Sequence, residues 1–377
     1  MAHHRTTRAE VDLLAFRQNF QSLRSCLDQQ TKVMAVIKAD GYGHGAVPCA
    51  KIAVECGADY LGAGVIEEGI ELRENGLNTP TLVLGSIFPD EAEDLVRHDL
   101  ATVVCTLPLA QALSKAAGKQ NKTVSVHIKV DTGMNRLGVT PENLAALLDS
   151  IRSLPNLKIE GVSTHFSSAD DEDPSFTLAQ LEKFRSVLPM LEKENIPILH
   201  CANTSALFKF PESHFNMVRP GLILYGALPS PSLRSFVNCE EKPFQPVMQW
   251  KSQVILVKAI AKGQPISYSG SYTTQRESLV ATLPIGYADG LHRTLSNNME
   301  VLIRGKRAPQ IGNICMDMTL IDVTEIQDVR AGDEVVLFGE QEGNVISVEE
   351  MAEKGKTIPY EILCNVGKRV PRFYLGE

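Results

Sequence analysis

The sequence predicts an α/β fold, an N-terminal (β/α)8 TIM-like barrel followed by a C-terminal, mainly-β domain. Over about 220 residues, eight short apolar runs alternate with amphipathic segments, which is typical of parallel strands and their crossover helices. The alternation stops near residue 228, and a polar, proline-rich segment at 229–246 precedes runs rich in β-forming residues. We therefore predict two domains, at 1–238 and 239–377. A doubly wound open sheet is the alternative for the first domain.

Each element of this prediction has its own local signal. An opening helix is indicated by Phe16, Phe20, Leu23 and Leu27, which recur at spacings of three and four. The predicted barrel strands are 33–37, 59–63, 81–84, 101–104, 124–130, 158–163, 197–201 and 216–218. Helices are predicted near 46–56, 66–75, 90–98, 108–117, 142–153 and 177–194, with shorter ones after Ala202 and Gly221. In the second domain, strands are predicted at 252–260, 278–283, 299–303, 318–323 and 334–338.

The composition is that of an ordinary globular protein, with 44% hydrophobic and 22% charged residues among 377. The net charge of −8 argues against a nucleic-acid partner, and no apolar run approaches the ~20 residues of a membrane-spanning helix. The N-terminus shows no apolar signal core, so a cytoplasmic location is expected. The eight cysteines form no Cys-x-x-Cys pair or zinc-like spacing, so we expect reduced thiols and no metal site.

A lysine stands where the first predicted barrel strand ends. Lys38 directly follows the apolar run 33–37 and precedes a glycine-spaced turn that carries Tyr42. A lysine held at the edge of a pocket can form a Schiff base with a carbonyl group. A solvated lysine is the other interpretation, because buried strands often end at charged residues.

Further polar residues fall at the carboxyl ends of other strands, where the chemistry of such barrels gathers. His165 ends the sixth predicted strand, and Arg219 ends the eighth. Thr204, with the N–H groups of Gly221 and Leu222 at a helix start, is suited to hold a phosphate. Taken singly, Arg219 could equally form a strand-end salt bridge and His165 could be a core histidine.

A lysine at one end of a pocket and a phosphate site at the other suit pyridoxal 5'-phosphate (PLP). This cofactor offers an aldehyde to the lysine and a phosphate to the cradle. Its pyridine nitrogen needs a partner, and Arg219 is placed to be one. Arginine stays protonated, so it would oppose protonation of the ring and limit side reactions such as transamination.

Several long motifs, in order, resemble those of alanine racemases, the bacterial PLP enzymes of fold type III. The resemblance runs from about Arg8 to Tyr374 and so covers nearly the whole chain. It rests on segments 36–45 (VIKADGYGHG), 129–138 (KVDTGMNRLG), 219–226 (RPGLILYG), 283–290 (LPIGYADG), 315–317 (CMD), 360–363 (YEIL) and 369–372 (RVPR).

The resemblance implies an amino-acid racemase that interconverts L- and D-alanine by two-base PLP chemistry and supplies D-alanine for peptidoglycan. Its implied catalytic residues are Lys38, which would carry the cofactor, and Tyr268, the base on the opposite face. Implied cofactor-binding residues are Lys38, Tyr42, His165, Thr204, Arg219, Gly221, Leu222 and Tyr360. Implied substrate-binding residues are Arg136, Met316 and Asp317. Family members are homodimers in which Tyr268 and Met316 would enter the partner's barrel, and Lys129 is often carbamylated.

Some positions depart from the usual pattern, and they leave substrate preference open. Asn135 and Ser269 stand where glycine is common, Thr204 replaces a serine, and Asn313 stands where arginine is frequent. The alternatives are a serine or broader-specificity racemase of the same fold, a fold-type-III PLP decarboxylase, and a non-enzymatic PLP carrier. The β domain with Tyr268 argues against a carrier, because a carrier needs no second base.

Overall fold

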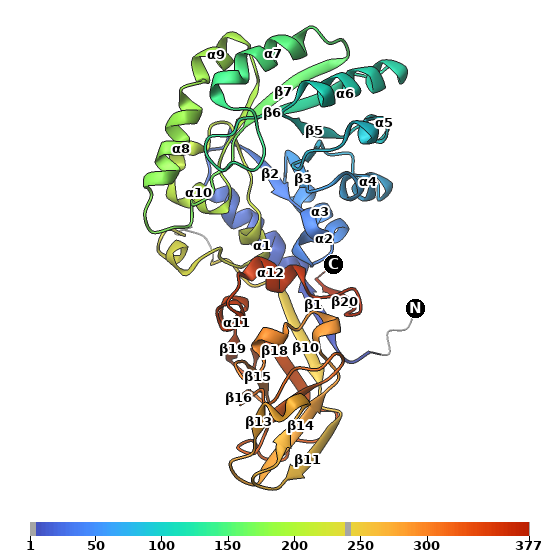
Figure 1. Ribbon diagram of the computed structural model, residues 1–377, viewed down its shortest axis with the longest axis vertical. Helices are drawn as coiled ribbons and strands as arrows, with labels where there is room; N and C mark the ends of the chain where they lie inside the picture. The colour runs from blue at the N-terminus through green and yellow to red at the C-terminus, as the bar shows by residue number, and fades with distance from the viewer. Residues whose placement is uncertain (1–4, 238–242, 377) are drawn as a thin grey trace.

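Eight parallel strands form the sheet of the N-terminal part, in the order β8-β7-β6-β5-β4-β3-β2-β9 (Figure 1). The structure is a computed structural model that describes residues 5–237 and 243–376. The two ends of the sheet meet, because Asn216 N–H donates to Leu199 O (3.4 Å) and Arg219 N–H to Ala202 O (2.9 Å). The predicted barrel is confirmed, and the open sheet is wrong. The strands are β2 (Lys32–Val36), β3 (Tyr60–Ala63), β4 (Thr81–Val83), β5 (Ala101–Val104), β6 (Val124–Lys129), β7 (Leu157–Ser163), β8 (Ile198–His200) and β9 (Met217–Val218).

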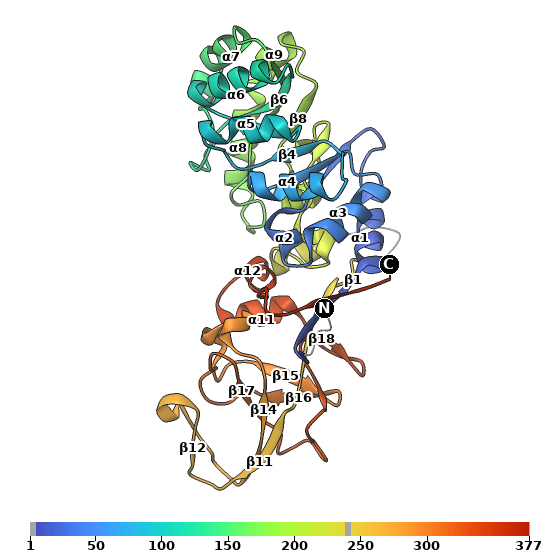
Figure 2. The ribbon, with the colours of Figure 1, turned by 90° about the vertical axis from the view of Figure 1, so that its right-hand side faces the viewer.

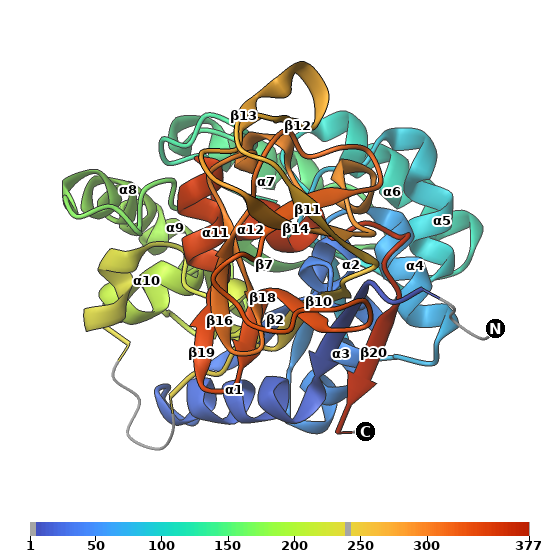
Figure 3. The ribbon, with the colours of Figure 1, turned by 90° about the horizontal axis from the view of Figure 1, so that it is seen from below.

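Helices follow the strands and surround the barrel, as the view from below shows (Figure 3). The predicted helix over 177–194 is in fact two helices. Pro189 cannot donate a hydrogen bond to Arg185 O, and its ring would clash with that carbonyl, so the chain breaks between α8 and α9. The helices are α1 (Leu13–Ser25), α2 (Lys38–Tyr42), α3 (Ala46–Glu55), α4 (Ile66–Glu74), α5 (Ala92–Arg97), α6 (Leu107–Lys119), α7 (Leu144–Arg152), α8 (Ser175–Arg185), α9 (Leu188–Lys193) and α10 (Thr204–Lys209).

The interior of the barrel is filled by side chains rather than open. One buried cluster gathers residues from most of the strands: Met34, Tyr60, Leu82, Ala101, Val103, Ile198 and Met217. Large side chains stacked in this way make a packed core, so a ligand can enter only at an end of the barrel.

The C-terminal part lies below the barrel in Figure 1 and is built on a seven-stranded sheet, in which β16-β15-β18-β10-β1-β20 run in order and β19 pairs with β18. Smaller sheets are β11-β14-β17 and β12-β13. The mainly-β prediction is confirmed, although the predicted run 252–260 spans parts of two strands. The elements are β10 (Met248–Gln253), β11 (Leu256–Ile260), β12 (Pro265–Ile266), β13 (Tyr272–Thr273), β14 (Ser278–Leu283), β15 (Glu300–Ile303), β16 (Lys306–Pro309), β17 (Thr319–Asp322), β18 (Glu334–Gln341), β19 (Asn344–Ile346), α11 (Val348–Gly355), α12 (Pro359–Cys364) and β20 (Arg372–Leu375).

The first strand of the chain, β1 (Arg8–Asp12), belongs to this C-terminal sheet. It pairs antiparallel with β10 and parallel with β20. Ala9 and Val11 are fully buried there, which anchors the strand. The apolar pattern of the sequence does not predict this strand, and the predicted domain boundary at 238/239 lies outside the described residues.

Among the residues that the structure describes, one cysteine departs from the expectation of reduced thiols. Cys26 is disulfide-bonded, so the expectation of reduced thiols is wrong for it. The free cysteines of the described chain are Cys49, Cys56, Cys105, Cys201, Cys315 and Cys364. Across residues 5–237 and 243–376, no helix has the length and apolar character needed to cross a bilayer.

One buried amide joins α1 to the segment that leads out of the barrel. Asn19 is fully buried, and its Nδ2 donates to Leu224 O (3.1 Å) and Gln245 O (2.8 Å). Its Oδ1 accepts from Gln245 N–H (2.7 Å). This side chain therefore satisfies three backbone groups that no regular element pairs.

We expect Asn19→Leu to destabilise the protein, because leucine has a similar size but leaves these backbone groups without partners. Each unsatisfied group costs ~1–3 kcal/mol, and partial exposure of Gln245 lowers the sum, so the expected loss is about 2 kcal/mol. Scanning calorimetry would measure it, with Gln21→Leu at an exposed position of the same helix as control. Equal melting temperatures for the two variants would contradict the expectation.

Candidate active site

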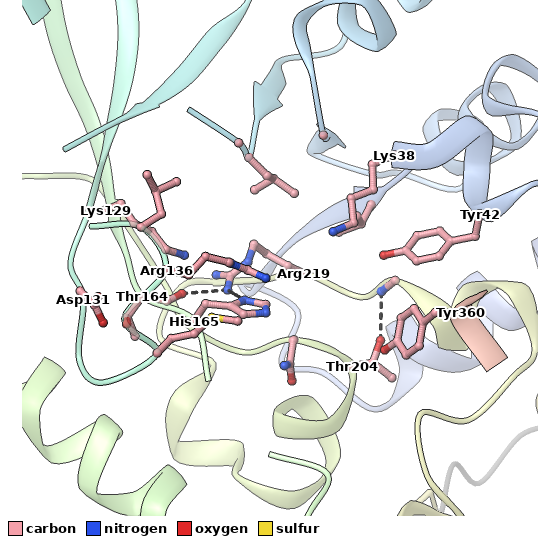
Figure 4. Close-up of a pocket in the computed structure, with 18 of the residues that line it drawn as sticks. Lys38, Tyr42, Lys129, Asp131, Arg136, Thr164, His165, Thr204, Arg219 and Tyr360 are labelled. Atoms are coloured by element: carbon pink, nitrogen blue, oxygen red, sulfur yellow. Dashed lines mark hydrogen bonds between the residues drawn. The ribbon is translucent and has the colours of Figure 1, made fainter. Parts of the chain in front are cut away.

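A cavity of ≈ 760 Å³ opens at the carboxyl ends of the barrel strands (Figure 4). Its walls come from the segments after β2, β3, β4, β6, β7, β8 and β9, and from α12, which lies where the β domain meets the barrel (Figure 1). The structure thus brings together eight of the predicted site residues, which are Lys38, Tyr42, Arg136, His165, Thr204, Arg219, Gly221 and Tyr360.

Lys38 begins a left-handed turn rather than a regular helix. Ala39, Asp40 and Tyr42 have φ of 54°, 53° and 51°. This conformation costs a non-glycine residue roughly 1–2 kcal/mol, so other contacts must hold it. The Glu68 carboxylate accepts from Ala39 N–H (2.6 Å), and Asp40 Oδ1 accepts from Ala46 N–H (2.8 Å). The strained turn fixes the direction in which Lys38 leaves the strand.

The Lys38 side chain extends from this turn toward the centre of the cavity (Figure 4). Burial lowers its pKa, and the charge of Arg136 lowers it further. A lowered pKa leaves more of the amine neutral at physiological pH, which is the nucleophilic form.

Hydroxyl groups gather at the opposite end of the cavity from Arg136. Tyr42, Thr204 and Tyr360 are close together there (Figure 4), and the Tyr42 and Tyr360 rings are 5.8 Å apart. Gly221 N–H donates to Thr204 Oγ1 (3.0 Å). A Cβ on residue 221 would lie 2.6 Å from the Tyr42 hydroxyl, so a larger residue there would displace that hydroxyl. Leu222 is buried and begins a 3-10 helix, whose first N–H groups have no partner within the helix. The arrangement could hold a phosphate.

Arg219 is 5% exposed and is surrounded by acceptors from two strand ends, those of β7 and β8. Its Nη1 donates to His200 O (2.8 Å) and His200 Nδ1 (3.0 Å). Its Nη2 donates to Thr164 O (2.9 Å), Cys201 O (2.9 Å) and His165 Nδ1 (3.2 Å). Burial lowers the pKa of Arg219 to about 10, so the guanidinium is charged at neutral pH.

His165 is neutral in this arrangement. Burial lowers its pKa well below the usual range, and the neighbouring Lys129 and Arg219 add to the effect. Because Arg219 can only donate, His165 Nδ1 must accept, which leaves its proton on Nε2.

Arg136 lies on a loop at the edge of the cavity. Within the described residues, its guanidinium makes no hydrogen bond or salt bridge, so it is available to an anionic ligand. Asp131 Oδ1 shapes the loop by accepting from Gly133 N–H (2.9 Å) and Asn135 N–H (3.1 Å). Asn135 has φ of 56°, a conformation that asparagine tolerates, which explains how it replaces glycine. Lys129 also lines the cavity, and its burial, together with the charge of Arg219, lowers its pKa well below the usual range.

Three predicted site residues lie outside the cavity of this chain. Tyr268 is 70% exposed and Met316 52% exposed. Asp317 forms a salt bridge with Arg369 (2.7 Å). Tyr268 belongs to the segment after β12, which projects from the body of the β domain (Figure 2). The Asn313 side chain holds this segment by donating to Tyr268 O (2.8 Å).

Sequence reasoning missed two residues that support the site. Glu68 also accepts from Gly64 N–H (2.6 Å) and so ties the next strand end to the Lys38 turn. His200 ends β8 and accepts from Arg219. The position of His200 at a strand end could have identified it, because the other candidate residues were predicted from such positions.

Comparisons with known proteins agree with this geometry. The family model "Alanine racemase, N-terminal domain" matches residues 11–229, and "Alanine racemase, C-terminal domain" matches residues 247–374. The alanine racemase of Halothermothrix orenii is 47% identical over 375 residues, covering 99% of this chain and 98% of that protein.

Solved structures are similar over the whole length. Alanine racemase from Bacillus anthracis with bound L-Ala-P has a TM-score of 0.93 at 35% identity, covering 100% of this chain and 96% of that one. The complex of the Clostridium difficile 630 enzyme with cycloserine has a TM-score of 0.90 at 35% identity, covering 99% and 96%. Since both domain models match in order and full-length relatives share this fold, the chain belongs to the alanine racemase family.

Proposed function

We propose that this chain racemises alanine with PLP held in the barrel cavity, and that Lys38 and a tyrosine from a second copy of the chain act as the two bases. The observation that carries the proposal is the cavity itself, which sets a desolvated lysine amine at one side of a hydroxyl-lined cradle. Its D-alanine product would serve peptidoglycan, and we place the reaction in the cytoplasm.

The residues present fit the cofactor. Tyr42, Thr204, Tyr360 and the amides of Gly221 and Leu222 would hold the phosphate, in a cradle that a Cβ at 221 would obstruct. Lys38 would hold the aldehyde carbon. Bound PLP would supply a conjugated ring that acidifies the α-C–H of the attached amino acid.

Arg219 and His165 would bind the ring. Arg219 keeps its proton, so a guanidinium next to the pyridine nitrogen would oppose protonation of that nitrogen. This favours rapid return of a proton to the α-carbon over transamination. His165, neutral and with its proton on Nε2, would pack beside the ring without adding a second charge.

Racemisation needs a proton removed from one face of the α-carbon and returned to the other. Lys38 Nζ would serve one face. Tyr268 Oη would serve the other, but it is exposed on a projecting segment and does not line the cavity of its own chain. We therefore propose a homodimer in which Tyr268 of each copy completes the other's site.

The substrate carboxylate would bind at the same junction between copies. The Arg136 guanidinium lies at the cavity edge and is paired with no group that the structure describes, and a carboxylate is its natural partner. The backbone of Met316, more than half exposed beside the Tyr268 segment, would supply a further donor. Asp317 would limit substrate size and charge near Tyr268.

The first experiment is incubation of the PLP-loaded protein with L-alanine and, separately, D-alanine. We expect both enantiomers to converge on an equal mixture, measured by chiral chromatography, because the two have the same free energy. Release of CO2 would indicate a decarboxylase, and no turnover would indicate a carrier. A panel of amino acids that includes serine would give the substrate range.

Removal of the Tyr268 hydroxyl should affect proton exchange on one face of the substrate α-carbon and leave exchange on the other face. In D2O, Tyr268→Phe should lose exchange of the L-alanine α-hydrogen by about 10²–10⁴-fold, because the tyrosine would take that proton. Exchange of D-alanine, which would depend on Lys38, should persist. Mass spectrometry of each enantiomer reads the result, and Tyr272→Phe on the neighbouring strand is the control. Equal loss for both enantiomers would refute the assignment of faces.

Complementation tests whether the site is shared. Lys38→Ala and Tyr268→Phe chains, each inactive alone, should regain about a quarter of wild-type activity when coexpressed. Half of the dimers would then be mixed, and each mixed dimer would contain one intact site. No recovery in mixed dimers isolated through two different tags would show that Tyr268 acts within its own chain.

A further inference from the structure

A line of buried polar side chains continues from Arg219 into the barrel, away from the cavity. His200 at the end of β8 accepts from Arg219 through Nδ1 (3.0 Å), and its Nε2 lies 2.9 Å from Nδ1 of His127 on β6. His127 Nε2 in turn lies 3.7 Å from Oε2 of Glu160 on β7. Both histidines are fully buried. The proposed reaction uses neither His127 nor Glu160, so their presence in the packed interior needs a reason.

The backbone makes room for the His127 ring. The pairing of β6 with β7 shifts register between Val126 and His127. On β7, a Cβ at Gly161 would lie 2.4 Å from His127 Nδ1, so any other residue there would displace the ring. The two imidazoles meet edge to face, with ring centroids 5.0 Å apart. The register shift and Gly161 together fix where the His127 ring can lie.

The proton positions along this line follow from its two ends. Arginine only donates, so His200 Nδ1 accepts and its proton is on Nε2. His200 Nε2–H therefore donates to His127 Nδ1, which leaves the His127 proton on Nε2, facing the Glu160 carboxylate. With the opposite tautomers, a His200 N–H would point at an Arg219 N–H, and a His127 nitrogen lone pair would point at the Glu160 carboxylate. Each N–H of the line thus points from Arg219 toward Glu160, and the last one, His127 Nε2–H, has no hydrogen-bond partner within the described residues.

The charges at the two ends support this order. The His127 imidazole, and then Lys158, lower the pKa of Glu160 to about 2, so Glu160 is anionic. Burial lowers the pKa of both His127 and His200, so both are neutral. Within the described residues, no carboxylate forms a salt bridge with Arg219. Glu160 therefore faces the last imidazole of the line at 3.7 Å, while its carboxylate also forms a salt bridge with Lys158 (3.2 Å).

We propose that His127 and Glu160 are positioning residues, which fix His200 as the Nε2–H tautomer and thereby hold the Arg219 guanidinium in the plane that faces the cofactor. The proposal rests on the proposed function. If His200 carried its proton on Nδ1, two donors would meet at 3.0 Å and the guanidinium would have to move. A displaced guanidinium would no longer oppose protonation of the ring nitrogen, so transamination would compete with racemisation.

The test compares two nearly isosteric replacements in the PLP-loaded protein. His127→Asn retains an acceptor near the position of Nδ1, whereas His127→Leu removes it. Leu82→Ala, which leaves a cavity in the same barrel interior but has no part in the line, is the control for packing. Three quantities are measured: kcat and KM for alanine, pyruvate formed per racemisation, and the tautomer of His200 by nitrogen-15 NMR of histidine-labelled protein.

We expect His127→Leu to lower kcat and to raise pyruvate per turnover, each by about tenfold, the effect of losing one hydrogen bond in a charged network. KM should stay within about twofold, because Arg136 is untouched. NMR should show His200 gaining the Nδ1–H form. His127→Asn should restore all three quantities, and Leu82→Ala should change only the melting temperature.

An unchanged His200 tautomer and pyruvate ratio in folded His127→Leu would overturn the proposal, as would an asparagine variant that behaves like the leucine one. If His127→Leu does not fold, Glu160→Gln decides, since Glu160 is partly exposed. Loss of its charge should shift the tautomer and ratio in the same direction, and no shift would overturn the proposal. Wild-type protein without racemase activity would instead refute the proposed function, and its NMR spectrum would still report the tautomer.

Discussion

A buried guanidinium that pairs with no carboxylate of residues 5–237 and 243–376 sets the electrostatics of the active-site end of the barrel. Arg219 is surrounded by backbone carbonyls and imidazole nitrogens, so its charge is solvated by dipoles rather than neutralised. That charge helps to keep neighbouring bases neutral, because it contributes to lowering the pKa of Lys129 and His165. A carboxylate in the same place would reverse each of these effects. The chemistry we propose depends on a positive rather than a negative charge at this position.

The other end of the cavity is organised by geometry instead. The left-handed turn after Lys38 places three non-glycine residues in a costly conformation, and Glu68 and Asp40 hold it by accepting backbone N–H groups. Strain of this kind persists only where the surroundings determine it more than once. Here the held backbone fixes where the Lys38 and Tyr42 side chains leave the chain. Rigid placement reduces the reorganisation that a reaction step would otherwise require.

How far the sequence could predict this structure depends on how each feature is encoded. The barrel strands were predicted to within a residue or two because strands buried on both faces are continuous apolar runs. β1 was missed because Arg-Ala-Glu-Val-Asp alternates charge with small apolar residues and is too short to stand out. The site residues at strand ends could be predicted because the fold brings such ends together. The line from His200 to Glu160 could not, since it depends on a register shift and on a glycine of another strand.

The pairing of β1 with both β10 and β20 also orders events during synthesis. Ala9 lies opposite Trp250 on one side and Arg372 on the other, so the first strand has no partner until most of the chain has left the ribosome. The barrel helices and strands between them contact near neighbours in sequence and can form early. Tyr360, which lines the cavity, lies in α12, the last helix before the final strand of the described chain. A nascent chain can therefore build most of its barrel, yet acquires a complete cofactor pocket only when translation is almost finished.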